Sequence, residues 1–229
     1  MPSKPMPEIK GTLRSHMIEL PTSIREASGI RIFGKRLKSF VFTTDVAIIK
    51  NPNADAVIAV YPFTPQPLIT SSLILAADVP VFCGVGGGIT TGKRVVNLAL
   101  DAEFKGAMGV VVNNPTPVEV IEQIKDTIDI PIIVTVVSEF EDIEAKIKAG
   151  ASILNVSGAK RTAYIVRKIR EKYADFPIIA TGGPTEETIK ATIEAGANAI
   201  TYTPPSTSEI FNELMKKYRS KYESDFMQE

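Results

Sequence analysis

A double-glycine turn near the C-terminus carries the groups best suited to hold an anion. Gly182 and Gly183 follow an apolar run, and a helix-like stretch opens just after them at Thr185. Glycine lets a backbone N–H group approach a ligand closely, and a helix N-terminus adds further donors and a favourable dipole. We therefore predict that Gly182 and Gly183 bind a phosphate group, with Ser206 and Thr207 as further donors at the start of the last helix. A tight structural turn is the alternative interpretation.

A second glycine-rich loop spans residues 84–94. Its segment 87–93 has the spacing of a nucleotide-binding P-loop, but Arg94 stands where a Ser or Thr would hold magnesium, so an NTPase is excluded. Each glycine adds conformational entropy to the unfolded chain, so the cluster indicates a lid hinge or backbone contact with a ligand, and a purely structural loop is the alternative. Lys93, at the following helix start, favours an anionic ligand or proton transfer. The glycines expected to contact substrate are Gly84, Gly86, Gly87 and Gly88.

Few titratable residues lie where a predicted strand ends. The candidates for moving a proton are Asp45, Lys93, Glu139 and Lys160. Each has an alternative role, because Asp45 and Glu139 are also suited to cap a helix and Lys160 is suited to a solvated surface. The single histidine, His16, lies before the repeated part of the chain, and we interpret it as structural. A Ser-His-Asp triad is therefore excluded.

The elements that must position these residues follow a repeat. From residue 38 onward, short apolar runs alternate with helical stretches, which is the pattern of parallel strands joined by crossover helices. Strands that open with proline alternate with strands that open with Gly-Ala or Asn-Ala, and the Gly-Ala pairs at Gly150 and Gly196 lie 46 residues apart. Four such units predict eight strands, at residues 39–43, 56–60, 79–83, 109–112, 131–136, 152–156, 177–180 and 199–202. The clearest predicted helices span residues 116–127, 139–148, 161–173, 186–194 and 208–218.

Eight such strands close a (β/α)8 TIM barrel, which we predict for residues 38–229. Residues 1–37 lie outside the repeat and form an N-terminal extension with a helix-like segment over residues 22–31. We expect this extension to pack on the base of the barrel or at an interface between subunits.

The chemistry of such barrels lies where the strands run into the following helices. Side chains alternate between two faces of a strand, and equivalent positions of the repeat place a set of polar side chains on one face. We expect that face to line the mouth of the barrel. The residues expected to contact a substrate there are Asn113, Thr135, Asn155, Ser157, Thr181, Thr201 and Thr203.

The composition excludes several classes of partner. Lys and Arg number 26, as do Asp and Glu, so the chain lacks the positive field that nucleic-acid binding needs. One cysteine, Cys83, excludes a disulfide framework and a multi-cysteine metal site, which fits a reducing cytoplasm. No apolar run is long enough to span a membrane. We expect a cytoplasmic protein with no metal, no cofactor, no nucleic acid and no membrane partner, and we leave homo-oligomer formation open.

The stretch 178–202 resembles the ribulose-phosphate-binding barrels. It contains a strand, Thr-Gly-Gly, a helix opened by Thr-x-Glu, and Glu-Ala-Gly-Ala-Asn-Ala before the last strand, and it is similar here to N-acylglucosamine-6-phosphate epimerases and thiazole synthases. The resemblance implies that the backbones of Gly182 and Gly183 grip a substrate phosphate. After the last strand the sequence departs from that pattern, because Pro204 and Pro205 stand where a glycine pair is expected and remove N–H donors. The whole chain also resembles uncharacterised bacterial barrels labelled hydrolases, although no hydrolytic constellation supports that activity.

These features predict an enzyme that acts on a small phosphorylated metabolite by proton transfer, as an isomerase, an epimerase or a lyase. A hydrolase of unknown substrate is the second candidate. A non-catalytic sensor that binds a metabolite at the mouth is the alternative from another class, because a fold alone does not separate binding from catalysis.

Overall fold

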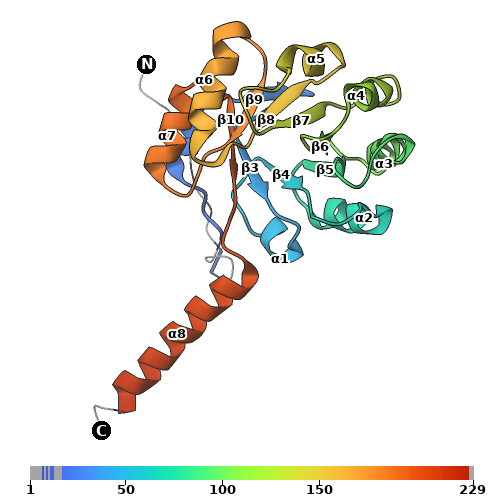
Figure 1. The fold of residues 1–229 in the computed structure, drawn as a ribbon. Coiled ribbons are helices and arrows are strands. Elements are labelled where there is room, and N and C mark those ends of the chain that lie inside the picture. The colour runs from blue at the N-terminus through green and yellow to red at the C-terminus, as the bar shows by residue number, and fades with distance from the viewer. Residues whose placement is uncertain (1–6, 8, 10, 13–16, 227–229) are drawn as a thin grey trace.

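The structure is a computed structural model that describes residues 7, 9, 11, 12 and 17–226, and it contains a closed barrel of eight parallel strands (Figure 1). The order around the barrel is β10-β3-β4-β5-β6-β7-β8-β9, so the last strand pairs with the first strand of the barrel. The predicted (β/α)8 barrel is confirmed. The strands are β3 (Ser39–Phe42), β4 (Ala56–Ala59), β5 (Val81–Gly86), β6 (Gly109–Val112), β7 (Ile132–Val136), β8 (Ile153–Val156), β9 (Ile178–Thr181) and β10 (Ala199–Tyr202).

A helix follows each strand of the barrel. Most ranges agree with the sequence prediction, but the helix expected from residue 139 begins only at Ile143, because Asp142 caps it and Glu141 accepts hydrogen bonds from the loop before it. The helices are α1 (Val46–Ile49), α2 (Pro67–Ala76), α3 (Lys93–Phe104), α4 (Val118–Lys125), α5 (Ile143–Lys148), α6 (Thr162–Lys172), α7 (Glu186–Glu194) and α8 (Thr207–Phe226), with a 3-10 turn η2 (Ala159–Arg161) before α6.

The strands separate two buried layers because their side chains alternate between the inside of the barrel and the helices. Phe40 and Phe82 meet edge to face inside the barrel, with ring centroids 5.3 Å apart. The other large interior side chains are Ile58, Val111, Ile133, Ile153 and Ile179. The residues between them, such as Val41, Val57 and Val134, pack under the helices. The barrel is thus filled by apolar side chains below its mouth.

At the base of the barrel, where the strands begin, one kind of hydrogen bond between a side chain and the backbone recurs. Four strands open with Asn-Ala or Gly-Ala, and at three of them the third residue accepts a hydrogen bond from the first backbone N–H of the preceding strand, whereas the fourth has Met108 at this position. Asp55 Oδ2 accepts from the N–H of Ser39 at 3.0 Å, Ser152 Oγ from that of Ile132 at 3.2 Å, and Asn198 Oδ1 from that of Ile178 at 2.9 Å. The repeat in the sequence therefore recurs as a repeated hydrogen bond that fixes the strand starts.

Arg170 on α6 forms a second set of hydrogen bonds at the base of the barrel. Its guanidinium donates to the carbonyl oxygens of Phe176 at 2.6 Å, Gly196 at 2.8 Å and Ala174 at 2.9 Å, and it also donates to Asn198 Oδ1. These acceptors lie in the segments that lead into β9 and β10, so one side chain connects α6 with two strand starts.

The N-terminal segment differs from the helix predicted over residues 22–31. It forms a 3-10 helix, η1 (Thr22–Glu26), and then a hairpin of β1 (Ile30–Ile32) and β2 (Lys35–Leu37). The helical part ends at Glu26, and the chain turns into the hairpin at Gly29, whose φ is 82° and where an added Cβ would approach the side chain of Arg36 to 2.8 Å. Ile30, Ile32 and Leu37 belong to the same buried cluster as the barrel interior, so the hairpin packs on the base. His16 lies outside the described residues.

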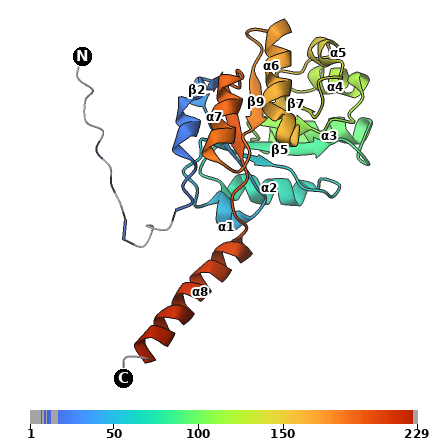
Figure 2. The same cartoon turned by 60° about the vertical axis from the view of Figure 1, so that its left-hand side comes forward.

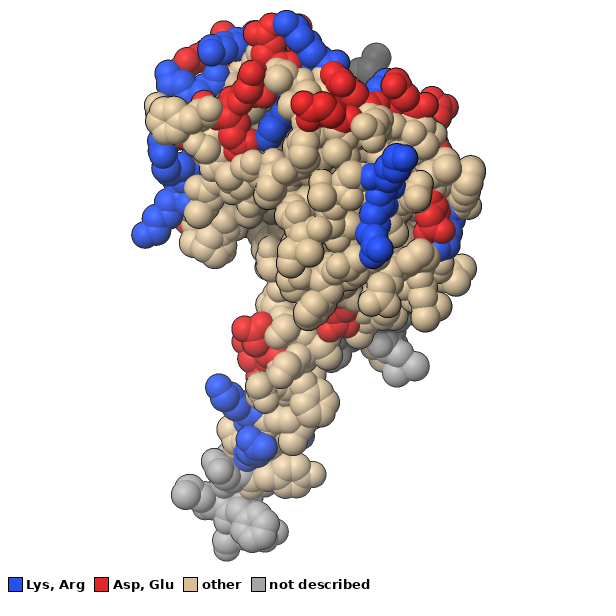
Figure 3. Space-filling view, turned by 45° about the vertical axis from the view of Figure 1, so that its right-hand side comes forward, with Lys and Arg blue, Asp and Glu red and all other residues tan. Residues whose placement is uncertain are grey.

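The last helix does not join the ring of helices. α8 leaves the mouth end of β10 and extends away from the barrel, as Figures 1 and 2 show from two sides. It continues well beyond the predicted end at residue 218. In the space-filling view it stands out from the body of the molecule (Figure 3).

Candidate active site

Polar side chains follow the apolar layers on the inside of four neighbouring strands. Thr135 and Asn155 are paired in the register of β7 and β8, and Thr181 and Thr201 are paired in that of β9 and β10. Each stands two residues after an interior apolar side chain, at the carboxyl end of its strand. Thr135, Asn155, Thr181 and Thr201, which the internal repeat predicts to lie on one face, thus share the inner face of one half of the mouth.

Two atoms of this set are buried without a hydrogen-bond partner among the described residues. They are Asn155 Oδ1 and Thr201 Oγ1, and the Thr201 side chain is buried. An unpaired buried polar group costs about 1–3 kcal/mol, and buried polar groups in folded proteins are nearly always satisfied. The half of the mouth formed by β7 to β10 therefore offers acceptors and donors that the protein itself leaves unused.

The remaining predicted contact residues lie farther out. Ser157 and Thr203 are exposed beyond the ends of β8 and β10. Asn113 follows β6 and lines a pocket of about 520 Å³ together with Tyr61, Thr64 and Thr90. This pocket lies over β4 to β6, in the other half of the mouth, so Asn113 is separated from the polar set on β7 to β10.

The glycine-rich loop lines the same pocket through Gly84, Gly86 and Gly87. Its glycines also have a structural reason that the sequence does not reveal. A Cβ on Gly86 would lie 2.5 Å from Val95 Cγ2, and a Cβ on Gly87 would lie 2.5 Å from Asn113 Cβ, while both have positive φ. The pairing of β5 with β6 also shifts between Gly84 and Gly86. The entropic argument for a ligand at this loop is therefore weakened, because packing alone requires two of the glycines; Gly88 meets open space.

Lys93 does not line the pocket that the glycines line. It is exposed at the start of α3 and lines a groove with Asn97, Gln123 and Asp126, which lie on or just after α3 and α4. Its place is the outer surface between two helices, so the predicted link between Lys93 and the glycine-rich loop has no support in the geometry.

Asp45 takes the capping role that the sequence left as its alternative. Its carboxylate accepts from the N–H groups of Ala47 at 2.8 Å and Ile48 at 3.4 Å at the start of α1. It also accepts a hydrogen bond from the hydroxyl of Thr207 at the start of α8. The hydroxyl of Thr207, followed by the backbone N–H donors, holds the pKa of Asp45 below its usual value, which makes this carboxylate a weak base.

Glu139 is the one proton-transfer candidate with a buried, unpaired carboxylate oxygen. Its Oε1 forms an ion pair with Arg161, and its Oε2 is buried without a partner among the described residues. Glu139 follows β7 and Arg161 follows β8, so the pair spans the loops above Thr135 and Asn155. Lys160, next to Arg161, is exposed.

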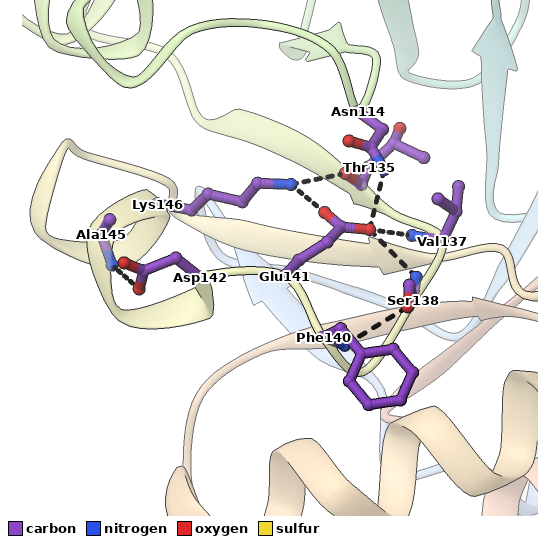
Figure 4. Close-up of polar contacts among 9 residues, drawn as sticks. All are labelled: Asn114, Thr135, Val137, Ser138, Phe140, Glu141, Asp142, Ala145 and Lys146. Carbon is purple, nitrogen blue, oxygen red and sulfur yellow. Dashed lines mark hydrogen bonds and ion pairs between the residues drawn. The ribbon is translucent and has the colours of Figure 1, made fainter.

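A second ion pair in the same loops was not anticipated from the sequence. Glu141 accepts at Oε1 from the N–H groups of Val137 at 2.7 Å and Ser138 at 2.9 Å, and its Oε2 pairs with the buried Lys146 (Figure 4). Asn114 Nδ2 donates to the same Oε1 at 2.7 Å from the loop after β6. Lys146 appears in the sequence as one of several helix lysines, and no signal distinguishes it from the exposed ones.

Several of the donors predicted to bind phosphate are already engaged by the chain. The N–H of Gly182 donates to the carbonyl oxygen of Thr201 at 3.3 Å. Glu187 lies in the first turn of α7, and its pKa is lowered by its own backbone N–H and then by the hydroxyl of Thr185. At α8, both the N–H and the hydroxyl of Ser206 donate to Glu209, at 2.8 and 2.7 Å. The chain thus places its own carboxylates where an anionic ligand was expected.

Two further observations limit the chemistry of the described residues. Cys83 lies on the helix-facing side of β5, and burial raises the pKa of its thiol to about 12, so it is not a nucleophile at neutral pH. Within residues 17–226 and the four described before them, no group of three or more His, Cys, Asp or Glu could hold a metal ion. No helix in that part of the chain is long and apolar enough to cross a membrane.

Comparison with known proteins supports the fold and leaves the family open. No family model matches the sequence, and no curated protein matches it. Among solved structures, the aldolase QR15 has a TM-score of 0.56 and 20% identity over 79% of this chain and 94% of its own. A phosphonopyruvate hydrolase in complex with oxalate and Mg²⁺ has a TM-score of 0.58 and 12% identity, covering 84% of this chain and 95% of its own. A mandelate oxidase has a TM-score of 0.62 and 14% identity, covering 77% and 68%.

The fold and the site thus define a TIM-barrel protein whose structural neighbours include an aldolase and a phosphonopyruvate hydrolase, both enzymes. The identities are too low to carry a substrate or a reaction from any of them to this chain.

Proposed function

We propose that the mouth of the barrel is the active site of an enzyme that moves a proton on a small polar metabolite, as an isomerase, an epimerase or a lyase. The observation that carries the proposal is the pair of buried, unpartnered polar atoms on the inner face, Asn155 Oδ1 and Thr201 Oγ1. A bound substrate with hydroxyl or carbonyl groups would satisfy both.

Glu139 is the group we assign to proton transfer. Its carboxylate is held by Arg161 through Oε1, which leaves the buried Oε2 to accept a proton from a bound substrate. Asp45, Lys93 and Lys160 are less suited, because Asp45 caps α1, Lys93 lies between α3 and α4, and Lys160 is exposed.

A phosphoryl group on the substrate would have to displace the chain's own carboxylates. Glu187 lies in the first turn of α7, and Glu209 accepts hydrogen bonds from Ser206 at the start of α8. We propose that a phosphorylated substrate exchanges with Glu187 at the turn of Gly183, which requires that glutamate to move into solvent. Because Glu187 is exposed, that movement is open to it.

The test is solvent deuterium exchange, which detects proton transfer before the reaction is known. The protein is incubated in D₂O with sets of three- to six-carbon sugar phosphates, their unphosphorylated counterparts and 2-oxo acids, and the loss of C–H signals is followed by proton NMR. We expect exchange with the wild type and loss of exchange in Glu139→Gln, with Asn155→Leu weakening ligand binding. Glu144→Gln, an exposed glutamate on α5, is the matched control.

The outcomes separate the alternatives. Ligand binding without deuterium incorporation would indicate the metabolite sensor, and unchanged exchange in Glu139→Gln would remove Glu139 from the mechanism. Tighter binding of sugar phosphates by Glu187→Gln would support the phosphoryl subsite, whereas equal binding of phosphorylated and unphosphorylated compounds would contradict it.

A further inference from the structure

The last helix lies beside the mouth of the barrel because another segment fills its place in the ring. In a TIM barrel the helices form a continuous outer ring. Here η1 packs against α7, and Ile18 exchanges backbone hydrogen bonds with Asn51 and Asn53, just after α1, at N–O distances of 2.9 and 3.2 Å. The segment 18–26 therefore closes the ring between α7 and α1. α8 begins beyond the carboxyl end of β10 and lines the mouth instead of the outer wall.

A hollow of about 1480 Å³ lies between α8 and the ends of β9 and β10. Thr181 and Thr201, which are polar side chains on the inner face of these two strands, line its inner end. Thr201 is only 5% exposed, and its Oγ1 has no hydrogen-bond partner among the described residues. Pockets for small molecules usually measure about 300–1,000 Å³. The hollow therefore has room for a ligand that reaches from Thr201 out to α8.

α8 turns a charged face toward this hollow. The residues of α8 that line it are Glu209, Asn212, Glu213 and Lys216. Their spacing of three, one and three residues places them on one face of the helix. Phe211 and Tyr218, on the opposite face, are 62% and 56% exposed. A helix that packs on a core turns its apolar face inward, so packing does not explain the charged lining of the hollow.

Carboxylates outnumber ammonium groups on this face of α8. The N–H of Ser206 and then its hydroxyl hold the pKa of Glu209 below its usual value, so Glu209 stays ionised. The Glu213 carboxylate forms no hydrogen bond or ion pair within the described part of the chain. Lys216 is the cation among the described residues that line the hollow. A cleft in which one sign of charge prevails attracts ligands of the opposite sign.

We propose that this hollow binds the ammonium group of the substrate, with Glu213 as its main acceptor, while Thr201 bonds a hydroxyl or carbonyl group of the same molecule. The substrate class is then a small amine that carries a hydroxyl or carbonyl group several bonds away. The inference rests on the proposed function in one respect, because it takes the molecule bound there to be the one whose proton is moved. A phosphoryl group at the turn of Gly183 would lie against a different wall of the hollow, the loop after β9.

The acceptors on α8 match an ammonium group. Such a group carries three N–H donors, and Glu209, Glu213 and the amide oxygen of Asn212 lie on the face that lines the hollow. Among the described residues no group of three or more His, Cys, Asp or Glu could hold a metal ion, so a divalent cation fits this lining less well. An anion is disfavoured because two carboxylates face Lys216 alone in this lining.

The test compares probes that differ in one end group. Aminobutanol and aminohexanol are titrated into isotope-labelled protein beside butanediol and hexanediol, and the dissociation constants are taken from the shifts of the amide NMR signals. We expect the amino alcohols to bind more tightly than the diols, and added salt to reduce the difference. Equal binding of amino alcohols and diols, or no binding of either amino alcohol, would overturn the proposal.

Two substitutions on α8 have opposite expected effects. Glu213→Gln should weaken binding of the amino alcohols about two- to fivefold, as for an exposed ion pair, and leave the diols unchanged. Lys216→Gln removes a repelling cation and should strengthen binding of the amino alcohols. Glu122→Gln, an exposed glutamate on α4, is the matched control and should change neither. Reversed effects of the two α8 substitutions would show that the hollow prefers an anion, and an unchanged affinity in Glu213→Gln would contradict the role of Glu213.

The inner end of the hollow is tested by Thr201→Val, which removes the hydroxyl and keeps the shape of the side chain. It should weaken amino alcohols and diols alike, since both carry a hydroxyl group. An effect on the amino alcohols alone, or none, would contradict the placement of that hydroxyl at Thr201.

These measurements need binding and no turnover, so they separate this inference from the proposed function. Deuterium exchange that depends on Glu139, together with equal binding of amino alcohols and diols, would keep the proposed enzyme and reject the ammonium site. Binding of amines that depends on Glu213, without deuterium exchange even when amino sugars join the substrate sets, would keep the ammonium site and reject proton transfer.

Discussion

The base and the mouth of the barrel treat their polar groups in opposite ways. At the base, Asp55, Ser152 and Asn198 each accept a strand N–H, and Arg170 donates to a set of carbonyl oxygens. At the mouth, by contrast, buried oxygens of Asn155, Thr201, Glu139 and Thr116 have no partner within the described part of the chain. Ser23 on η1 also has an unpaired hydroxyl, and nothing in the structure explains it.

The difference indicates that the base of the barrel contributes to stability and that the mouth is suited to bind a ligand. Hydrogen bonds at the base hold the strand register, so those side chains contribute to stability. Unpaired polar atoms at the mouth cost stability, about 1–3 kcal/mol each when fully buried, and this cost is expected where a ligand supplies the missing partner. In TIM barrels generally, the strand ends at the mouth carry the chemistry and the opposite end carries stability.

We expect the largest effect from the buried ion pair of Glu141 and Lys146. This pair is an exception to the comparison, because it lies at the mouth and its polar groups are nevertheless paired. Glu141→Ala leaves the Lys146 ammonium buried and removes the acceptor for the N–H groups of Val137 and Ser138. We expect a loss of about 3 kcal/mol or more in the free energy of unfolding, measured by urea denaturation. Glu144→Ala on the exposed face of α5 is the control. A loss below about 1 kcal/mol would mean that water replaces the carboxylate.

At the base, Arg170→Ala should cost about 3 kcal/mol, because several carbonyl oxygens around β9 and β10 lose their donor together. Arg170→Lys should lose stability as well, since an ammonium cannot reach the same set of acceptors from one position. Arg167→Ala, at an exposed position one turn earlier on α6, should change stability by less than about 0.5 kcal/mol. Equal losses for Arg170→Ala and Arg167→Ala would contradict the role of Arg170.

A matched pair of asparagines compares the two ends directly. Asn198→Leu at the base removes the acceptor for Ile178 and Arg170 and should cost about 2 kcal/mol. Asn155→Leu at the mouth replaces an amide whose oxygen is unpaired, so it should change the free energy of unfolding by less than about 1 kcal/mol, or raise it. The measurement is urea denaturation of both variants in the same buffer. A loss for Asn155→Leu as large as that for Asn198→Leu would show that the mouth is bonded like the base.

The sequence predicted the barrel because the information for it is local and repeated. The features that indicate it each lie within one βαβα unit: prolines at strand starts, Gly-Ala pairs after helices and alternating side chains. Because the unit occurs four times, the pattern can be recognised in the sequence. The inner position of Thr135, Asn155, Thr181 and Thr201 follows from the same alternation. The strand ranges differ by a few residues, most at β5, where the shift between Gly84 and Gly86 lengthens the strand.

What the sequence did not predict depends on contacts between distant residues. The N–H of Gly182 faces Thr201, the hydroxyl of Thr207 reaches Asp45, and Gly87 packs on Asn113. No local pattern carries such pairings. The same holds for Lys146, whose burial depends on Glu141 turning back toward the loop after β7. The extension of α8 away from the ring also depends on a distant segment, η1, that fills its place.

The smallest expected effect concerns Asp45, which connects the mouth end of α1 to the start of α8. The pKa of this carboxyl is lowered in the folded protein, chiefly by the hydroxyl of Thr207. A lowered pKa means that the unfolded chain binds the proton more readily, so this contribution to stability is present above the ordinary pKa of 3.8 and is lost as the pH falls below it. Asp45→Ala should cost about 1 kcal/mol at neutral pH through loss of the helix cap.

Asp45→Asn separates the two contributions of Asp45, because asparagine still caps a helix but does not titrate. We expect the stability of Asp45→Asn to lie close to that of the wild type at neutral pH and to fall less between pH 5 and pH 3. Thr207→Val should remove most of the same pH dependence while leaving the cap on α1 intact. If Thr207→Val instead keeps the full pH dependence, the bond between α1 and α8 contributes nothing, and the orientation of α8 must be set by the packing of Ile210 on the barrel alone.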